Sequence, residues 1–199
     1  MKSMSGKTSN GIRRITLDIE TTSSGNIIDP ASLELSVVCT HDTETDSYTA
    51  YTVPELPSLW PILEKADLIV GYNSDHFDIP ILNKYYAGDL AGVPSVDLLA
   101  EIKNVLGRRL KLDSVAEGTL GRKKSGSGLD AVRWWEAGEY EKVKKYCIDD
   151  VRITKEIYEF ALKNGFVKYS NFGEIRQIPL DTSKWESGQK ASMTHILPF

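Results

Sequence analysis

The first half of the chain alternates apolar and polar residues, which is the pattern of β-strands that bury one face. Residues 12–22 show this alternation, and residues 33–42 and 47–53 have the same strand character. The short polar stretch 42–46 between the last two predicts a hairpin. Residues 67–72 form an apolar run, which is typical of a strand buried on both faces.

The rest of the chain has mostly helical periodicity. The segments with this pattern are residues 57–66, 79–88, 98–106, 111–118 and 139–163. We expect Gly88 to end the second of these helices and Gly165 to end the last. Residues 94–99 predict one more short strand, and residues 165–180 predict a final hairpin that turns at 171–173.

The order of these elements predicts the fold class. Three early strands in a meander, followed by alternating strands and helices, indicate an α/β domain with a mixed central sheet flanked by helices. We expect a disordered polar leader over residues 1–11, the main domain over 12–165, and a C-terminal hairpin and tail over 166–199 packed on the same domain. At 199 residues the chain can bury a proper core, and we expect a monomer.

The composition excludes several classes of protein. No apolar run reaches the roughly 18 residues of a membrane helix, and the N-terminus lacks the apolar core of a secretory signal. Cys39 and Cys147 are too few for a disulfide framework and lie in apolar segments, so we expect reduced core thiols in a cytoplasmic protein. The formal net charge of -4 gives no general attraction to nucleic acid, so a basic binding surface must be local.

Two carboxylates share one face of the first predicted strand. Asp18 and Glu20 are two residues apart, so their side chains leave the same side of the strand, while Leu17 and Ile19 take the other side. Paired carboxylates on a central strand repel each other, and a divalent cation such as Mg²⁺ or Mn²⁺ would resolve that conflict. The alternative is an edge strand with a solvated polar face.

Asp78 follows the apolar strand 67–72, where ligand sites in open α/β sheets lie beyond the strand ends. It also stands immediately before a predicted helix, so an ordinary helix N-cap is the alternative. A third cluster lies on the helix 139–163, where Tyr146 and Asp150 are four residues apart and share one face. Asp150 falls beside the apolar stripe, whereas Asp149 should point towards solvent; a packed tyrosine with an exposed aspartate is the alternative.

These three clusters, taken in order, resemble the motifs of the DEDD superfamily of 3′–5′ exonucleases, in the branch that carries a tyrosine (DEDDy). The matching positions are Asp18 and Glu20 in D-x-E, Asn73, Phe77 and Asp78 in N-x(2–3)-[FY]-D, and Tyr146 and Asp150 in Y-x(3)-D. The chain is similar to the proofreading domains of family B DNA polymerases, and more so to free-standing or helicase-linked relatives of them. The resemblance covers roughly residues 12–163 and implies a ribonuclease H-like fold.

The resemblance also implies a mechanism with two Mg²⁺ or Mn²⁺ ions per site. It assigns metal ligation to Asp18, Glu20, Asp78 and Asp150. Tyr146 would orient the attacking water rather than act as a general base, because an unperturbed tyrosine pKa is about 10. Thr21, Asn73 and Phe77 would contact the substrate; for Asn73 a turn residue and for Phe77 a core aromatic are the alternatives.

A basic segment offers contacts for the nucleic-acid backbone. Residues 101–133 carry eight Lys or Arg side chains against four Asp or Glu side chains, a local excess of four positive charges. The candidate phosphate contacts are Lys111, Arg122, Lys123 and Lys124, and a solvated surface is the alternative reading. Trp134 and Trp135 follow, and they could stack on bases or pack in the core.

The sequence therefore predicts a metal-dependent 3′–5′ exonuclease that acts on a single-stranded DNA or RNA 3′ end, with a helicase or polymerase as a conceivable partner and no membrane. Two other hypotheses remain open: a non-catalytic nucleic-acid- or partner-binding module of the same fold, and a ribonuclease H-type endonuclease.

Overall fold

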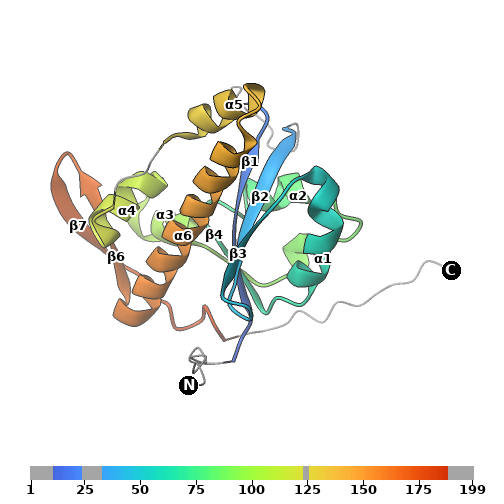
Figure 1. Cartoon of the computed structure of the whole chain (residues 1–199). Helices are drawn as coiled ribbons and strands as arrows, with labels where there is room; N and C mark the ends of the chain where they lie inside the picture. The colour runs from blue at the N-terminus through green and yellow to red at the C-terminus, as the bar shows by residue number, and fades with distance from the viewer. Residues whose placement is uncertain (1–10, 24–32, 123–125, 188–199) are drawn as a thin grey trace, which may run out of the picture.

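The computed structural model describes residues 11–23, 33–122 and 126–187, so the expected leader lies almost entirely outside the described residues. Its centre is a five-stranded mixed sheet with the order β3-β2-β1-β4-β5 (Figure 1). The strands are β1 (Arg14–Thr21), β2 (Leu35–Asp42), β3 (Ser47–Tyr51), β4 (Leu68–Gly71) and β5 (Ser95–Asp97). The first three pair antiparallel, and β4 and β5 join them in parallel, which confirms the predicted meander followed by parallel strands.

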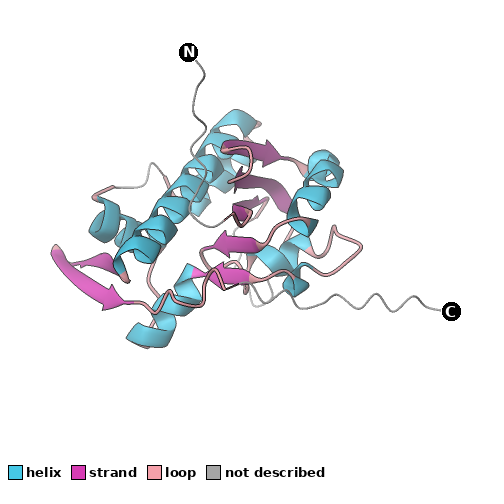
Figure 2. Cartoon of the chain, turned by 90° about the horizontal axis from the view of Figure 1, so that it is seen from below, coloured by secondary structure: helices cyan, strands magenta, loops and turns pink. Residues whose placement is uncertain are grey.

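Helices cover both faces of the sheet (Figure 2). One face carries the apolar side chains of Leu17, Ile19 and Ile69, which pack with α1 (Leu56–Glu64) and α2 (Asp78–Leu82). Alternate residues of the same strands point to the opposite face, as the two-residue period of a strand requires. The hydrophobic core is therefore divided by the sheet into two layers.

The second face is covered by the longest helix, α6 (Tyr140–Asn164), which packs across β1, β2, β3 and β4 (Figure 1). The other helices of the second half are α3 (Leu98–Leu106), α4 (Leu112–Leu120) and α5 (Gly128–Glu136). The sequence predicted α3, α4 and α6 to within two residues at each end. Within the described residues, no helix is long and apolar enough to cross a membrane.

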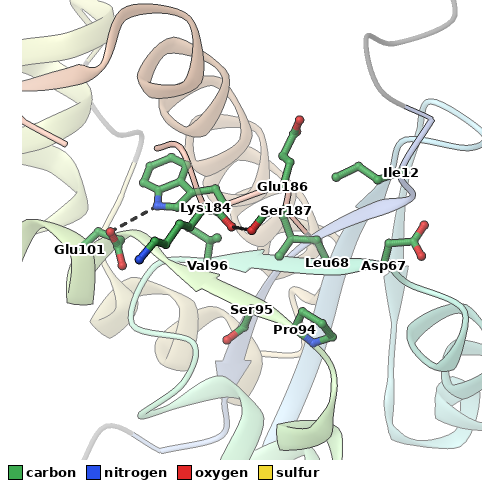
Figure 3. A pocket seen from close by; sticks show the side chains of 11 residues that line it. Ile12, Asp67, Leu68, Pro94, Ser95, Val96, Glu101, Lys184, Glu186 and Ser187 are labelled. Carbon is green, nitrogen blue, oxygen red and sulfur yellow. Dashed lines mark hydrogen bonds between the residues drawn. The ribbon is translucent and has the colours of Figure 1, made fainter. Parts of the chain in front are cut away.

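The predicted C-terminal hairpin is present as β6 (Phe166–Asn171) and β7 (Glu174–Pro179). It lies against α4, and the approach is so close that a Cβ atom on Gly118 would overlap the backbone of Tyr169. The segment that follows it reaches the amino end of the sheet, where the Trp185 ring stacks on Tyr158 and its Nε1 donates to Glu101 at 3.3 Å. Figure 3 shows this segment beside a cavity of about 620 Å³ that Leu68 and Val96 also line.

One sequence prediction about helices was wrong, and one helix was not predicted. The helix expected over 79–88 is only α2, Asp78–Leu82, and Gly88 does not end it. Asn83 turns the chain instead, because its side chain donates to Asp89 and accepts the backbone N–H of Leu90. No element was predicted for residues 128–136, which form α5. Its start after a Gly- and Ser-rich stretch is stabilised by a capping box between Ser127 and Asp130.

Candidate active site

Two carboxylates project from the central strand toward the α6 side of the sheet. Asp18 and Glu20 on β1 are half-buried, and the intervening Ile19 packs in the layer on the other face. Asp18 lies opposite Cys39 on β2, and a β-bulge follows at Glu20 and Thr21. Because β1 lies between β2 and β4 in the sheet, the edge-strand alternative is ruled out. The two carboxylates lie toward the carboxyl end of β1, beyond the residues that pair with β4.

The long helix brings a third carboxylate to the same place. Asp150 is 4% exposed, and one oxygen of each of Asp18, Glu20 and Asp150 lies within 4.8 Å of the others. Asp149, the next residue on α6, is partly exposed and pairs with Arg152 at 2.5 Å. The helix register therefore separates these two aspartates as the sequence predicted.

Two buried cysteines anchor α6 to the strands beneath it. The Cys147 thiol donates to the backbone carbonyl of Asp18 at 3.3 Å, and the Cys39 thiol contacts the Lys144 carbonyl at 3.7 Å. Burial raises the pKa of the Cys147 thiol, so it keeps its proton and remains a donor. Both residues are free and buried, as predicted, and they hold the helix that carries Asp150 against the strand that carries Asp18.

The three carboxylates fit a hard divalent cation. Grouped like charges in a partly buried place destabilise one another, and oxygen ligands of this kind suit Mg²⁺ or Mn²⁺. The described residues contain one such group, formed by Asp18, Glu20 and Asp150. The donor set is therefore of a kind that suits a divalent cation.

Asp78 lies next to this group without being part of it. Its carboxylate accepts the backbone N–H of Ile19, between the two carboxylates of β1, at 3.1 Å. Phe77 is the N-cap residue of α2 and Asp78 is its first helical residue, so Asp78 does not occupy the N-cap position that the alternative supposed. Burial, together with the nearby charge of Asp97, raises the pKa of Asp78 to about 8. A bound cation would favour its ionised form.

Asp97 is a buried carboxylate that sequence reasoning missed. It is 5% exposed and accepts backbone N–H groups from Asn73 (2.7 Å) and Asp75 (3.3 Å) as well as from Leu99 (2.9 Å) and Ala100 (3.2 Å). The last two cap α3, and an aspartate before a helical pattern is a recognisable cap signal. The bonds from Asn73 and Asp75 fix the loop that carries the second motif, which contains Asn73, Phe77 and Asp78. No sequence pattern revealed these two bonds.

That loop is compact and partly strained. Asn73 has a left-handed backbone, with φ of 72°, which confirms it as a turn residue. Gly71 lets the chain fold back, because a Cβ atom there would overlap the side chain of Ser74. Phe77 is partly buried and packs against the apolar layer around α2. Asn73 is therefore a turn residue and Phe77 packs as a core aromatic, as the structural alternatives supposed. Neither of these roles excludes a contact with substrate.

A cavity of about 230 Å³ opens beside Glu20. It is lined by Ile19, Glu20, Thr21, Ser23, Phe77, Gly128 and Val132. Two of the predicted substrate residues, Thr21 and Phe77, therefore share one cavity with a predicted metal ligand. The Thr21 hydroxyl itself donates to the Ser23 carbonyl at 2.9 Å. The wall formed by α5 was not predicted, although Ser127 and Asp130 have the spacing of a capping box that could have indicated the start of that helix.

Tyr146 is 4% exposed and belongs to the apolar cluster between α5, α6 and β2. The edge of its ring meets Trp134 with the centroids 6.0 Å apart, while Trp135 packs on Tyr140. Trp134 and Trp135 are both half-buried in this cluster, so the core reading of these residues has structural support.

The predicted phosphate contacts have different surroundings. Lys111 is exposed and precedes α4. Arg122 pairs with Glu156 at 2.8 Å, so much of its charge is already neutralised. Lys123 and Lys124 lie outside the described residues.

A mixed α/β fold with grouped carboxylates on its central strand is an arrangement that can hold divalent cations for phosphodiester hydrolysis. A family model described as the RNase_H superfamily matches residues 15–162, and the chain belongs to that superfamily. The chain is also similar to DNA polymerase 2 of Aeropyrum pernix, with 27% identity over 86% of this chain and 25% of the polymerase.

A solved structure of the family B DNA polymerase from Pyrobaculum calidifontis shares the fold. The TM-score is 0.59 and the sequence identity is 19%, over 79% of this chain and 25% of the polymerase. The chain thus spans about a quarter of the length of each polymerase that it matches. The likeness to the two polymerases supports the resemblance seen in the sequence and extends over most of this chain.

Proposed function

We propose that this protein is a metal-dependent 3′–5′ exonuclease that removes nucleotides from single-stranded ends. The observation that carries the proposal is the convergence of Asp18, Glu20 and Asp150 from two distant segments, within 4.8 Å, beside a small cavity. Membership of the RNase H superfamily and the similarity to family B DNA polymerases support a nuclease activity. Exonucleolytic direction rests on the motif resemblance.

The proposed metal site uses the chain's own carboxylates. Asp18, Glu20 and Asp150 would hold Mg²⁺ or Mn²⁺, and Asp78 would serve a second ion from its position beside Ile19. Bound ions of this kind stabilise the charge that develops on the attacking and leaving oxygens of a phosphodiester. The anchored helix α6 and strand β1 hold the ligands in place, so little reorganisation accompanies metal binding.

Tyr146 would orient the attacking water through its hydroxyl group. Its ring is held by Trp134 and by burial in the α6 layer, which would limit its rotation. A tyrosine in this role contributes through position, since its pKa lies well above neutral pH. Asp150, one turn further along α6, would be held by the same packing.

The cavity beside Glu20 would receive the terminal nucleotide. Its volume of about 230 Å³ is below that of typical pockets for drug-sized ligands, which suits a part of a polymer rather than a whole free molecule. Phe77 offers an aromatic surface and Thr21 a polar one in this cavity. Single-stranded substrates fit this proposal because a base can enter only when it is unpaired. A helicase or polymerase partner would supply such ends.

An end-labelling experiment tests the proposal. Oligonucleotides of DNA and RNA carrying a 5′ label are incubated with Mn²⁺, with Mg²⁺ or with EDTA, alongside 3′-labelled copies. We expect stepwise ladders from the 5′-labelled strand and immediate release of the 3′ label, both abolished by EDTA. Internal cuts would indicate a ribonuclease H-type endonuclease. Binding without any cleavage would indicate a non-catalytic module.

A further inference from the structure

An exposed arginine contacts the second motif. The Arg109 Nη2 atom donates to the side-chain oxygen of Asn73 at 2.6 Å. Two other exposed arginines pair with carboxylates, Arg133 with Asp130 and Arg176 with Glu174. Over the described ranges, Arg109 has no such ion pair. Its partner is a neutral amide, so the charge of the guanidinium stays available to an anion.

The loop around Arg109 is fixed to the end of β4. Gly107 ends α3 in a left-handed conformation, with φ of 75°, and its N–H donates to the Lys103 carbonyl at 2.8 Å. The Tyr72 hydroxyl donates to the carbonyl of Leu110 at 3.0 Å. Tyr72 directly precedes Asn73, so adjacent residues of one segment contact Arg109 and Leu110.

Asn73 is itself held rigidly. Its N–H donates to the buried carboxylate of Asp97 at 2.7 Å, and its carbonyl accepts the N–H of Phe77 at 3.0 Å. These bonds fix the left-handed backbone that aims the Asn73 side chain at Arg109. The sequence predicted that Asn73 contacts substrate. In the structure its side-chain oxygen accepts a hydrogen bond from Arg109.

This pair lies at the same end of the sheet as the carboxylates. Asn73 follows the carboxyl end of β4, and Phe77, four residues later, lines the cavity beside Glu20. A negative cluster needs positive charge nearby if an anionic strand is to approach it. A guanidinium has five N–H donors and matches a phosphate with two parallel bonds, so Arg109 retains donors after its bond to Asn73.

We propose that Arg109, positioned by Asn73, binds a backbone phosphate of the substrate strand next to the metal-binding carboxylates. This inference rests on the proposed function, because it takes the anion to be a nucleic-acid phosphate. Among the predicted phosphate contacts, Arg122 has its charge paired with Glu156, and we propose Arg109 for this contact in its place.

The test measures binding and chemistry separately on the whole protein. A short fluorescein-labelled oligothymidylate is titrated by anisotropy with Ca²⁺ in place of Mn²⁺, after a gel has shown it to be intact. We expect Arg109→Ala to weaken binding about tenfold, the effect of one charge-assisted contact. The slope of log affinity against log salt should fall by about 0.7. The single-turnover rate with Mn²⁺ at saturating oligonucleotide should stay within a few-fold.

Two further variants separate this role from a loss of structure. Arg109→Lys keeps the positive charge but loses the parallel N–H donors of the guanidinium group. The affinity of this variant for the oligonucleotide should therefore lie between those of wild type and Arg109→Ala. Arg176→Ala removes a paired surface arginine of the hairpin and should bind like wild type. If Arg176→Ala weakens binding as much as Arg109→Ala, the contact is not specific and the inference is overturned.

A double-mutant cycle tests the positioning role of Asn73. Asn73→Gly removes the side-chain amide while allowing the left-handed backbone. We expect it to weaken binding in the wild-type background and to have no further effect in Arg109→Ala. Additive losses would show that Asn73 meets the substrate independently, and would overturn its role through Arg109.

The outcomes distinguish this inference from the proposed function. If wild type binds and degrades the oligonucleotide and Arg109→Ala behaves identically, the inference fails and the nuclease stands. If wild type binds through Arg109 but never cleaves, the nuclease proposal fails and the phosphate contact stands. If wild type neither binds nor cleaves, both are wrong.

Discussion

Buried charges are arranged differently at the two ends of the central sheet. The amino end is defined by the starts of β1, β4 and β5, and the carboxyl end by the ends of these strands. At the amino end, Arg14 is 7% exposed and pairs with Glu186 at 2.5 Å, and Arg13 pairs with Asp42. At the carboxyl end, three carboxylates gather within 4.8 Å. Oppositely charged pairs stabilise the fold directly, whereas carboxylates grouped this closely also suit a divalent cation. We therefore expect substitutions at the amino end to change stability and substitutions at the carboxyl end to change metal binding and activity.

The largest expected effect comes from removing one carboxylate of the group. Asp150→Asn should lower the nuclease rate by more than about 1000-fold, because it removes a proposed metal ligand of the candidate active site. The metal-free fold should be retained or stabilised, since like-charge repulsion is relieved. Single-turnover assays and thermal unfolding measure the two quantities. Asp149→Asn is the matched control. A larger loss of rate in that variant would show that Asp149, and not Asp150, is the active carboxylate of α6.

Tyr146→Phe should have the next largest effect. Phenylalanine keeps the ring packed against Trp134 and removes only the hydroxyl group. We expect the single-turnover rate to fall by about 10- to 1000-fold, or ~1.4–4 kcal/mol of barrier, with metal affinity nearly unchanged. Calorimetric titration of Mn²⁺ provides the second readout. Normal turnover in this variant would leave Tyr146 as a purely structural residue.

The amino end should respond in stability and not in activity. Arg14→Met should destabilise the fold by about 1.5–3 kcal/mol, because it removes a charge-assisted bond and leaves Glu186 without its arginine partner. Denaturant unfolding measures this loss, and the specific activity should match wild type while the protein remains folded. Arg176→Ala, which breaks an exposed pair, should change stability by less than about 1 kcal/mol. A large loss of metal binding in Arg14→Met would contradict the expectation that the amino end of the sheet contributes to stability and not to metal binding.

Filling the cavity should impair catalysis more gently. A Cβ atom on Gly128 meets nothing within 4 Å, so Gly128→Val can be accommodated and would narrow the cavity beside Glu20. We expect the apparent KM to rise by about tenfold with little change in stability, since one lost contact of that size is ~1.4 kcal/mol. Gly128→Ala is the smaller control. An unchanged KM in Gly128→Val would show that the substrate does not enter this cavity.

The smallest effect concerns pH. His41 on β2 is 1% exposed, and desolvation lowers its pKa below the ordinary value. The folded state thus binds fewer protons than the unfolded state, so stability should be complete above about pH 6.5 and decline as the pH falls. The slope cannot exceed ~1.4 kcal/mol per pH unit for this one group. Unfolding curves of His41→Phe, which keeps an aromatic ring beside Tyr48, should be flatter over this window; an identical slope would contradict the assignment.

The sequence by itself determined the strands, most of the helices and the residues of the candidate site. The two-residue alternation around Asp18 and Glu20, and the helical spacing of Tyr146 and Asp150, depend only on local geometry. Periodicity therefore predicted which side chains share a face. The resemblance added the order of the motifs and, with it, the expected chemistry.

Only the tertiary structure decided which distant groups meet. The Asp78 bond to the β1 backbone, the role of Asp97 in the second-motif loop and the Arg109 contact with Asn73 join residues 22–59 positions apart. Short sequence windows carry no signal for such pairs, because their energy depends on burial and on neighbours supplied by the whole fold. For the same reason the sequence did not show that α2 ends at Leu82, where the Asn83 side chain bonds to the Leu90 backbone. It also did not show that Arg122 pairs with Glu156 on α6.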